Sequence, residues 1–252
     1  MQSKSPVIKN RFSGTSVRRM RGVSLVGLLI STAVSVPIIG SVLIFYVNAL
    51  ESAAYMNSVA RVQESGRFAT DHIARTLRMT RYDDPHTPLV VPTELSGTTS
   101  AATSLSMAGF TLKADTDVVS SSHEGAPQVR DCQGVTVASG SLVTNTYAIS
   151  DGDELICRTA ADPVVIAEGV EDMQVLYGID SDADDAANRY VLEGNVTDWS
   201  QVVSIRVSLL INSVEAVYAS TIHDCKSCNT FSPLASDLLR AEFHATVRFR
   251  NL

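Results

Sequence analysis

The sequence lacks the short motifs on which enzymes and nucleotide-binding proteins are built. It has no glycine-rich phosphate loop, and none of its five histidines stands in a His-Glu-x-x-His zinc motif or beside a nucleophile elbow. The net charge is −7, which argues against a broad phosphate-binding surface. We therefore expect no enzymatic activity, no cofactor and no direct contact with nucleic acid.

The N-terminal part of the chain lacks acidic residues, and the segment that follows it lacks charged residues of either sign. Residues 1–22 contain six basic residues and no acidic one, and the next 28 residues, 23–50, contain no charge at all. The rest of the chain carries −13, which is the total of −7 without the +6 of the leader. About 20 apolar residues cross a bilayer as a helix, and basic residues before such a run stay in the cytoplasm.

The apolar run is too long for the core of a cleaved secretion signal, and no Ala-x-Ala-like site follows it. We therefore expect one membrane-spanning segment with an acidic body outside the cytoplasm. One interpretation of this arrangement is a bitopic, periplasmic-facing membrane protein of unknown activity.

Cysteine is absent until residue 132. The four cysteines are Cys132, Cys157, Cys225 and Cys228. An even number beyond a membrane segment favours two disulfides in an oxidising compartment, and four unpaired thiols are the alternative. Cys225 and Cys228 form a CxxC motif, which elsewhere binds zinc or acts in redox chemistry. Because no second pair and no βαβ pattern accompany it, we expect a local disulfide.

Small and apolar residues recur at helical spacing after the membrane segment and predict an amphipathic helix over residues 51–82. This stripe consists of Tyr55, Val59, Val62, Gly66, Ala69, Ile73 and Leu77. Because the stripe needs an apolar partner, we expect it to pack on a β-sheet. The whole helix would then run from residue 23 to residue 82.

Strand patterns dominate the second half of the chain. Apolar and polar residues alternate over 203–209 and 243–249, and Asp151-Gly152-Asp153 predicts a hairpin joining strands at 147–149 and 155–157. Further strands are expected at 164–167 and 173–177. Residues 93–128, rich in Ser, Thr, Ala and Gly, predict surface loops with short strands at most. The expected fold class is α+β, with one antiparallel sheet that is wet on one face.

The junction between leader and apolar run, Arg21-Gly22-Val23-Ser24-Leu25, resembles the class III signal of type IV pilins and type II secretion pseudopilins. The resemblance implies that a prepilin peptidase cuts between Gly22 and Val23 and methylates the new N-terminus of Val23. The apolar run then survives cleavage. It holds the subunit in the membrane and later packs among sister helices in a filament.

The sequence departs from that family at one position. The fifth mature residue is usually a glutamate that pairs with the N-terminal ammonium of a neighbouring subunit, and here it is Gly27. Pilin-like proteins without this glutamate are typically placed at a filament tip.

Several downstream segments resemble the PilW family of minor pilins. They are residues 59–82 (VARVQESGRFATDHIARTLRMTRY), 169–173, 177–180, Trp199 and 247–251. The resemblance implies a type IV pilin-like fold divided into a leader (1–22), a transmembrane and filament-core helix (23–50), an amphipathic helix (51–82) and a periplasmic β-domain (83–252). The family's habit of a disulfide-bounded region supports a Cys132–Cys157 bridge, which would contribute roughly 3 kcal/mol.

The function implied by the resemblance is that of a minor pilin that primes pilus assembly. Its expected partners are other minor pilins, the major pilin, the prepilin peptidase and the inner-membrane assembly platform, with a tip adhesin as a further candidate. Its expected location is the inner membrane before assembly and the pilus tip afterwards. A minor pseudopilin of a type II secretion system is the alternative.

One acidic segment has the beginning of a calcium-loop pattern. Asp180, Asp182 and Asp184 alternate like the first ligands of a calcium loop. The match then fails, because position 6 of the loop is Asp185 rather than glycine and position 12 is Val191 rather than glutamate. A solvated acidic turn is favoured, and no metal is predicted.

Overall fold

The computed structural model describes residues 24–82, the backbone of 95–98, and residues 107, 109–216, 231 and 238–249. Residues 1–49 and 50–252 form two separate units. Gly22, Val23, Cys225 and Cys228, named above as candidate sites, lie outside the described residues.

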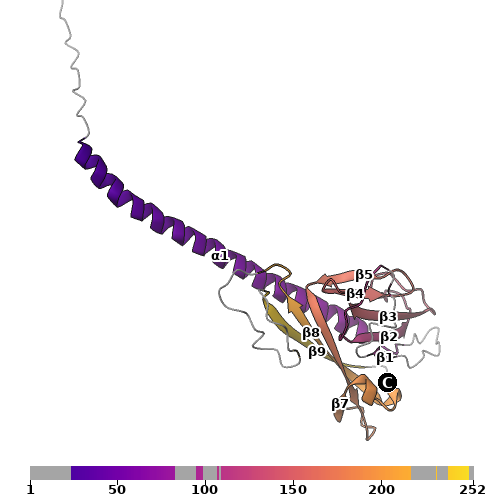
Figure 1. Cartoon of the computed structure of the whole chain (residues 1–252). Helices are drawn as coiled ribbons and strands as arrows, with labels where there is room; N and C mark the ends of the chain where they lie inside the picture. The colour runs from indigo at the N-terminus through magenta and orange to yellow at the C-terminus, as the bar shows by residue number, and fades with distance from the viewer. Residues whose placement is uncertain are drawn as a thin grey trace, which may run out of the picture. The chain divides into compact units, whose positions relative to one another are not determined.

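A single helix, α1 (Leu25–Leu77), extends over 53 residues (Figure 1). The predicted long helix is therefore confirmed. Its expected apolar stripe is buried from Val62 onward, whereas Tyr55 and Val59 are only half-buried. Ile73 and Leu77 are almost fully buried, and each such side chain contributes about 1.5–3 kcal/mol.

The β-strands of the described residues form two antiparallel sheets where the sequence predicts one. One sheet has the order β1-β2-β3-β4-β5 and the other β7-β6-β8-β9, and Figure 1 shows β1 to β5 side by side. The strands are β1 (Leu95–Thr98), β2 (Val118–Glu124), β3 (Leu142–Ile149), β4 (Glu154–Arg158), β5 (Val164–Glu168), β6 (Val170–Ile179), β7 (Arg189–Val191), β8 (Val202–Asn212) and β9 (Arg240–Arg248). Two short 3-10 helices, η1 (Glu193–Asn195) and η2 (Trp199–Gln201), precede β8.

The main core lies where the buried face of α1 meets both sheets. The helix contributes Val62, Ala69, Ile73, Ala74 and Leu77, and the sheets contribute among others Tyr147, Leu155, Met173 and Leu209. A smaller cluster on the other face of the first sheet includes Met107, Val118, Ala148 and Ile156. The predicted hairpin is present, because β3 and β4 pair antiparallel on either side of the Asp151-Gly152-Asp153 turn.

The helix ends at Leu77, five residues before the predicted end at Tyr82. Arg81 adopts a left-handed conformation (φ 61°), and its backbone N–H donates to the carbonyl of Ser122 in β2 at 2.9 Å. Its Nη2 donates to the carbonyl of Trp199 at 2.7 Å. The segment that follows α1 is therefore bound both to the first sheet and to the segment that leads into β8.

Two strand predictions were wrong. Residues 93–128 were expected to form surface loops with short strands at most, yet the seven-residue β2 is buried except at Ser120 and lies inside the first sheet, paired with β1 and β3. Its serines are accommodated there because Ser120 and Ser122 bond the hydroxyls of Thr146 and Thr144, each at 2.8 Å.

The second error concerns β8, which was expected to be wet on one face. Every residue of β8 except Arg206 is buried. β8 is a central strand of its sheet, with β6 on one side and β9 on the other, so side chains of both neighbouring strands shield its residues from solvent. On its polar face, the Ser204 hydroxyl donates to the hydroxyl of Tyr190 at 3.1 Å.

Candidate functional site

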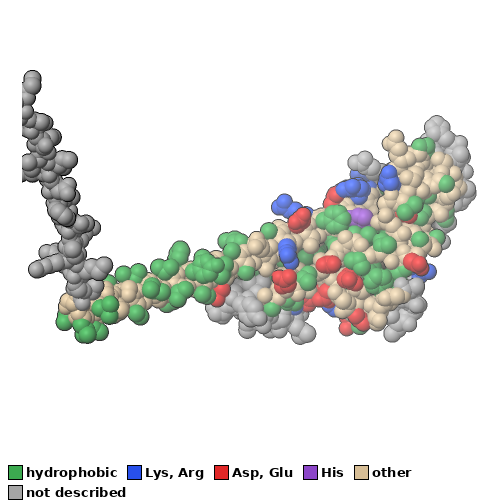
Figure 2. Space-filling model, turned by 90° about the horizontal axis from the view of Figure 1, so that it is seen from above, with side chains coloured by type: hydrophobic (Ala, Val, Ile, Leu, Met, Phe, Trp, Pro, Cys, Tyr) green, Lys and Arg blue, Asp and Glu red, His purple; other side chains and the backbone are tan. Residues whose placement is uncertain are grey.

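The first half of α1 presents apolar side chains to its surroundings. Every residue from 24 to 50 is exposed except Gly40, which is half-buried, and Leu25 and Phe45 are each 75% exposed. Figure 2 shows apolar side chains along this part of the helix. By length and composition, α1 is the one helix of the described residues able to cross a membrane. A surface of this kind is covered either by lipid or by other proteins.

Gly27 lies in this exposed segment. A Cβ placed there would meet one neighbouring atom, the Cβ of Ser24 at 4.0 Å. A larger side chain therefore fits at position 27 within this chain. The absence of the glutamate is not forced by the packing of α1 itself.

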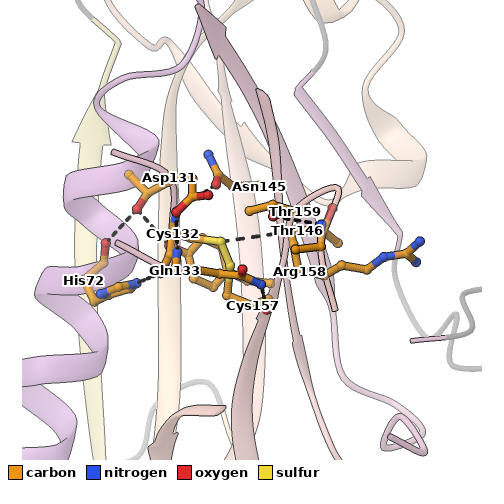
Figure 3. The surroundings of a disulfide bond; sticks show 12 residues. His72, Asp131, Cys132, Gln133, Asn145, Thr146, Cys157, Arg158 and Thr159 are labelled. Carbon is orange, nitrogen blue, oxygen red and sulfur yellow. Dashed lines mark hydrogen bonds between the residues drawn. A yellow bond between two sulfur atoms is a disulfide. The ribbon is translucent and has the colours of Figure 1, made fainter. Parts of the chain in front are cut away.

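The body contains a disulfide between Cys132 and Cys157, the bridge that the family resemblance implies (Figure 3). Both residues are almost completely buried, and Cys157 lies in β4. The backbone N–H of Cys132 donates to Oδ1 of Asn145 in β3 at 2.8 Å. The carbonyl of Cys132 accepts from Nε2 of His72 on α1 at 3.0 Å. The bridge and these two bonds fix the segment around Cys132 to the sheet and to the helix.

A second contact ties the same turn of α1 to β3. The hydroxyl of Tyr147 donates to Oγ1 of Thr76 at 2.8 Å, and the rings of His72 and Tyr147 meet edge to face with centroids 5.9 Å apart. Burial raises the pKa of the Tyr147 hydroxyl, so it stays protonated and able to donate. Together with the disulfide, these contacts form one helix–sheet clamp.

Burial disfavours the charged form of two histidines, His72 within the clamp and His123 beside it. Burial lowers the pKa of His72 and of His123 from the ordinary value of 6.5. His123 lies fully buried in β2, and its Nδ1 is 3.3 Å from the amide of Asn145. Because Oδ1 of Asn145 accepts from Cys132, the amide nitrogen donates to Nδ1 of His123.

These histidines predict a loss of stability on acidification. Below about pH 6.5 the unfolded chain binds protons that folded His72 and His123 exclude, so the free energy of unfolding falls as the pH falls. Asp117 acts in the opposite direction. Burial raises the pKa of Asp117 from 3.8 to about 6. The folded chain therefore binds a proton that the unfolded chain does not, and the free energy of unfolding rises as the pH falls from about 6 to about 3.8.

His123→Gln is expected to reduce the loss of unfolding free energy between about pH 7 and pH 5, by at most about 1.4 kcal/mol per pH unit. Urea unfolding followed through the only tryptophan, Trp199, measures this difference at each pH. His244→Gln, at an exposed position in β9, is the matched control. A loss in His123→Gln equal to that of the wild type would contradict the assignment.

The acidic segment after β6 forms a compact turn. Asp180, Asp182 and Asp184 each offer a carboxylate oxygen within 4.8 Å of the others. The Asp180 carboxylate accepts backbone N–H groups from Asp182 (3.1 Å), Ala183 (2.8 Å) and Asp185 (2.8 Å). Burial alone would raise the pKa of Asp180, but these bonds lower it on balance. They account for the turn without an ion, and we propose no metal there.

Sequence reasoning missed one buried ion pair. Arg240, the first residue of β9, donates to the carboxylate of Glu171 in β6 through Nε (2.6 Å) and Nη2 (3.2 Å). Only 6% of the arginine side chain and 17% of the glutamate side chain are exposed. The two residues are 69 positions apart, so no local pattern links them.

The architecture defines a class before any comparison with other proteins. A continuous helix that is apolar and exposed at first, and then buried on antiparallel sheets, confirms the predicted α+β fold with a long N-terminal helix, and the outline is that expected from the pilin resemblance.

Sequence comparison identifies the branch of that class for part of the chain. Residues 129–251 match the family model PilW, described as Type IV Pilus-assembly protein W. The predicted resemblance to the PilW family is therefore confirmed over this range. The leader motif and residues 59–82 lie outside the match, so their resemblance stays a prediction.

Comparison with solved structures finds a similar pilin. The type IV-like pilin TTHA1219 from Thermus thermophilus is similar with a TM-score of 0.46 and 14% identity, over 79% of this chain and 98% of that chain. No curated protein matches the sequence. The expectation that the chain is not an enzyme stays a prediction.

Proposed function

We propose that this chain is a minor type IV pilin of the PilW kind that helps prime pilus assembly at or near the pilus tip. The observation that carries the proposal is the division of α1. Residues 24–50 expose apolar side chains, whereas the buried stripe from Val62 to Leu77 packs on the sheets. One helix therefore offers a membrane or filament surface at one end and anchors a folded body at the other.

The proposed order of events follows from this division. The leader, residues 1–22, stays in the cytoplasm until the prepilin peptidase cuts between Gly22 and Val23 and methylates Val23. Residues 23–50 hold the subunit in the inner membrane, with the amphipathic helix 51–82 and the β-domain 83–252 in the periplasm. The assembly platform then brings the helix among those of other minor pilins and the major pilin, with a tip adhesin as a further candidate partner.

Gly27 supports a place at the tip rather than along the shaft. Without a carboxylate at this position, the subunit cannot pair with the N-terminal ammonium of a neighbour through residue 27. A subunit in the shaft needs this contact, whereas a capping subunit does not.

Processing is tested by intact-mass measurement of the full chain extracted from membranes. We expect a product that begins at Val23 and carries one N-terminal methyl group. Gly22→Val should block cleavage, because the bulky side chain stands at the scissile bond, and Gly14→Val is the control in the same leader. A wild-type chain that still begins at Met1 would rule out the pilin proposal.

The priming role is tested by counting surface pili. Deletion of the gene should remove most pili, and expression of the wild-type chain should restore them. Normal piliation in the deletion strain would remove the priming role. Loss of secretion with normal piliation would instead favour a type II secretion pseudopilin. Gly27→Glu fits the helix sterically, so unchanged piliation in that variant would show that the missing glutamate is tolerated rather than required.

A further inference from the structure

An open groove lies between α1 and strand β5 in the body. Its volume is about 440 Å³. One wall is a single face of the helix, with residues spaced as i, i+3, i+4 and i+7: Arg61, Glu64, Ser65 and Phe68. The other wall is the end of β5, residues 166–168, and the segment 212–214 closes one end.

Two large apolar side chains that line this groove, Phe68 and Val214, are exposed, and two more are exposed in the part of β5 that precedes the groove. Phe68 is 54% exposed and Val214 57%, and Val164 and Val165 of β5 are 37% and 40% exposed. These four are half of the eight large apolar side chains that are exposed among the described residues beyond position 50. Such a concentration marks a surface that another molecule covers.

The backbone of β5 is also open on one side. β5 is the last strand of its sheet and pairs only with β4, and no other described residue forms a backbone hydrogen bond with residues 164–168. Natural sheet edges are usually shortened or carry lysine, proline or other charges. β5 has the sequence VVIAE, with no lysine or proline and with one charged residue, Glu168, at its end.

The other edge strands of the described sheets are protected against the addition of a further strand, either because they are short or because they carry charges. β1 has four residues and β7 has three, while β9 carries Arg240, Glu242 and Arg248. β5 is therefore the edge with both a free backbone and apolar side chains, which is the combination that accepts an added strand.

The charges beside the groove indicate the sign of its partner. Glu64 and Glu168 are exposed and line the groove, and no ion pair joins either one to another described residue. Arg61 is already matched by Glu215 at 3.5 Å. The surplus is negative and favours a basic group on the occupant.

We propose that β5 receives an extended segment from a different subunit of the same filament. The segment pairs its backbone with the free edge of β5 and places apolar side chains against Phe68 and Ile166. A lysine or arginine of the segment lies near Glu64 and Glu168. The identity of the partner as a filament subunit rests on the proposed function; the open edge of β5 does not.

The test places a photo-cross-linking amino acid at Phe68 of the full chain in piliated cells. We expect a covalent adduct with a second, different polypeptide. Val165→Lys should reduce the adduct about ten-fold, because a charge on the edge opposes strand addition. Leu192→Lys, at a position 46% exposed after β7, is the control and should leave the adduct unchanged. Trp199 fluorescence verifies that both variants are folded.

Three outcomes would overturn the proposal. They are no adduct from Phe68, an adduct consisting of two copies of this chain, and an adduct from Phe68 that persists in Val165→Lys. The mass and pilus-count experiments separate this failure from that of the proposed function. A processed chain needed for pili but without an adduct would disprove the docking edge alone. An unprocessed chain with the adduct would disprove the pilin role alone.

Discussion

Glu171→Ala is expected to lower the free energy of unfolding by about 3–5 kcal/mol, because it removes the buried carboxylate to which two nitrogens of the Arg240 guanidinium donate. Only 6% of the Arg240 side chain is exposed, and two of its nitrogens donate to the Glu171 carboxylate. Glu171 occupies a β-bulge in β6, where the pairing with β8 skips from Val170 to Asp172. The bulge directs the carboxylate toward β9, which pairs with β8 on one side only among the described strands.

Urea unfolding of the full chain in detergent measures this loss. Trp199 is the only tryptophan, and its ring lies edge to face with Tyr177 at 4.9 Å, so its fluorescence reports on the folded body. Glu215→Ala is the matched control, since it removes a pair whose side chains are 67% and 74% exposed and should cost less than about 1 kcal/mol. The double variant Glu171→Leu with Arg240→Met should lose far less than the two single variants together. Equal losses in Glu171→Ala and Glu215→Ala would contradict the role of the buried pair.

Gly66→Leu is expected to destabilise the body by about 3 kcal/mol, because α1 and β9 approach too closely at this point for a side chain. A Cβ at position 66 would overlap the ring of Phe243. Both residues belong to or border the main core, so neither can move aside without opening a gap. Glycine is here a packing requirement, although it weakens the helix itself.

The same unfolding measurement tests this requirement. Gln63→Leu introduces the same side chain at an exposed position of the same helical turn and should change stability by less than about 0.5 kcal/mol. Phe243→Ala should restore part of the loss in Gly66→Leu, because it removes the atoms that clash. A midpoint for Gly66→Leu equal to that of Gln63→Leu would show that the helix and β9 separate at no cost.

Local patterns predicted most of the secondary structure. The stripe from Val62 to Leu77 follows a 3.6-residue period, and the Asp151-Gly152-Asp153 turn is a local hairpin signal. Both depend only on residues close in sequence. The division of the strands into two sheets depends on long-range pairing, which such patterns do not contain.

The misses have a common physical cause. β2 reads as a loop because Ser120, Ser122 and His123 are polar, yet their partners Thr144, Thr146 and Asn145 all come from β3. A polar strand is stable in a sheet only when its neighbour supplies matching groups, and the neighbour is not visible locally. The same holds for the end of α1, where the carbonyl that receives the N–H of Arg81 belongs to β2.

The candidate sites also differ in whether residues close in sequence are enough to predict them. Gly27 and the cysteines were found from sequence because each stands out as a residue type at its position. The β5 edge was missed, because VVIAE looks the same in a central strand as at an edge. Only its neighbours distinguish the two cases.

The helix–sheet clamp has a mechanical consequence. If the chain is the filament subunit proposed above, tension along the filament pulls on α1 along its axis, and the body resists through the contacts at the end of the helix. The bonds of His72 and Thr76 to Cys132 and Tyr147, and that of Arg81 to Ser122, join the helix to strands β2 and β3 and to the disulfide loop. Because the disulfide fixes Cys132 covalently to β4, a force that reaches His72 is shared among three strands. The body is therefore expected to yield by shearing several hydrogen bonds at once, rather than by peeling away one strand at a time.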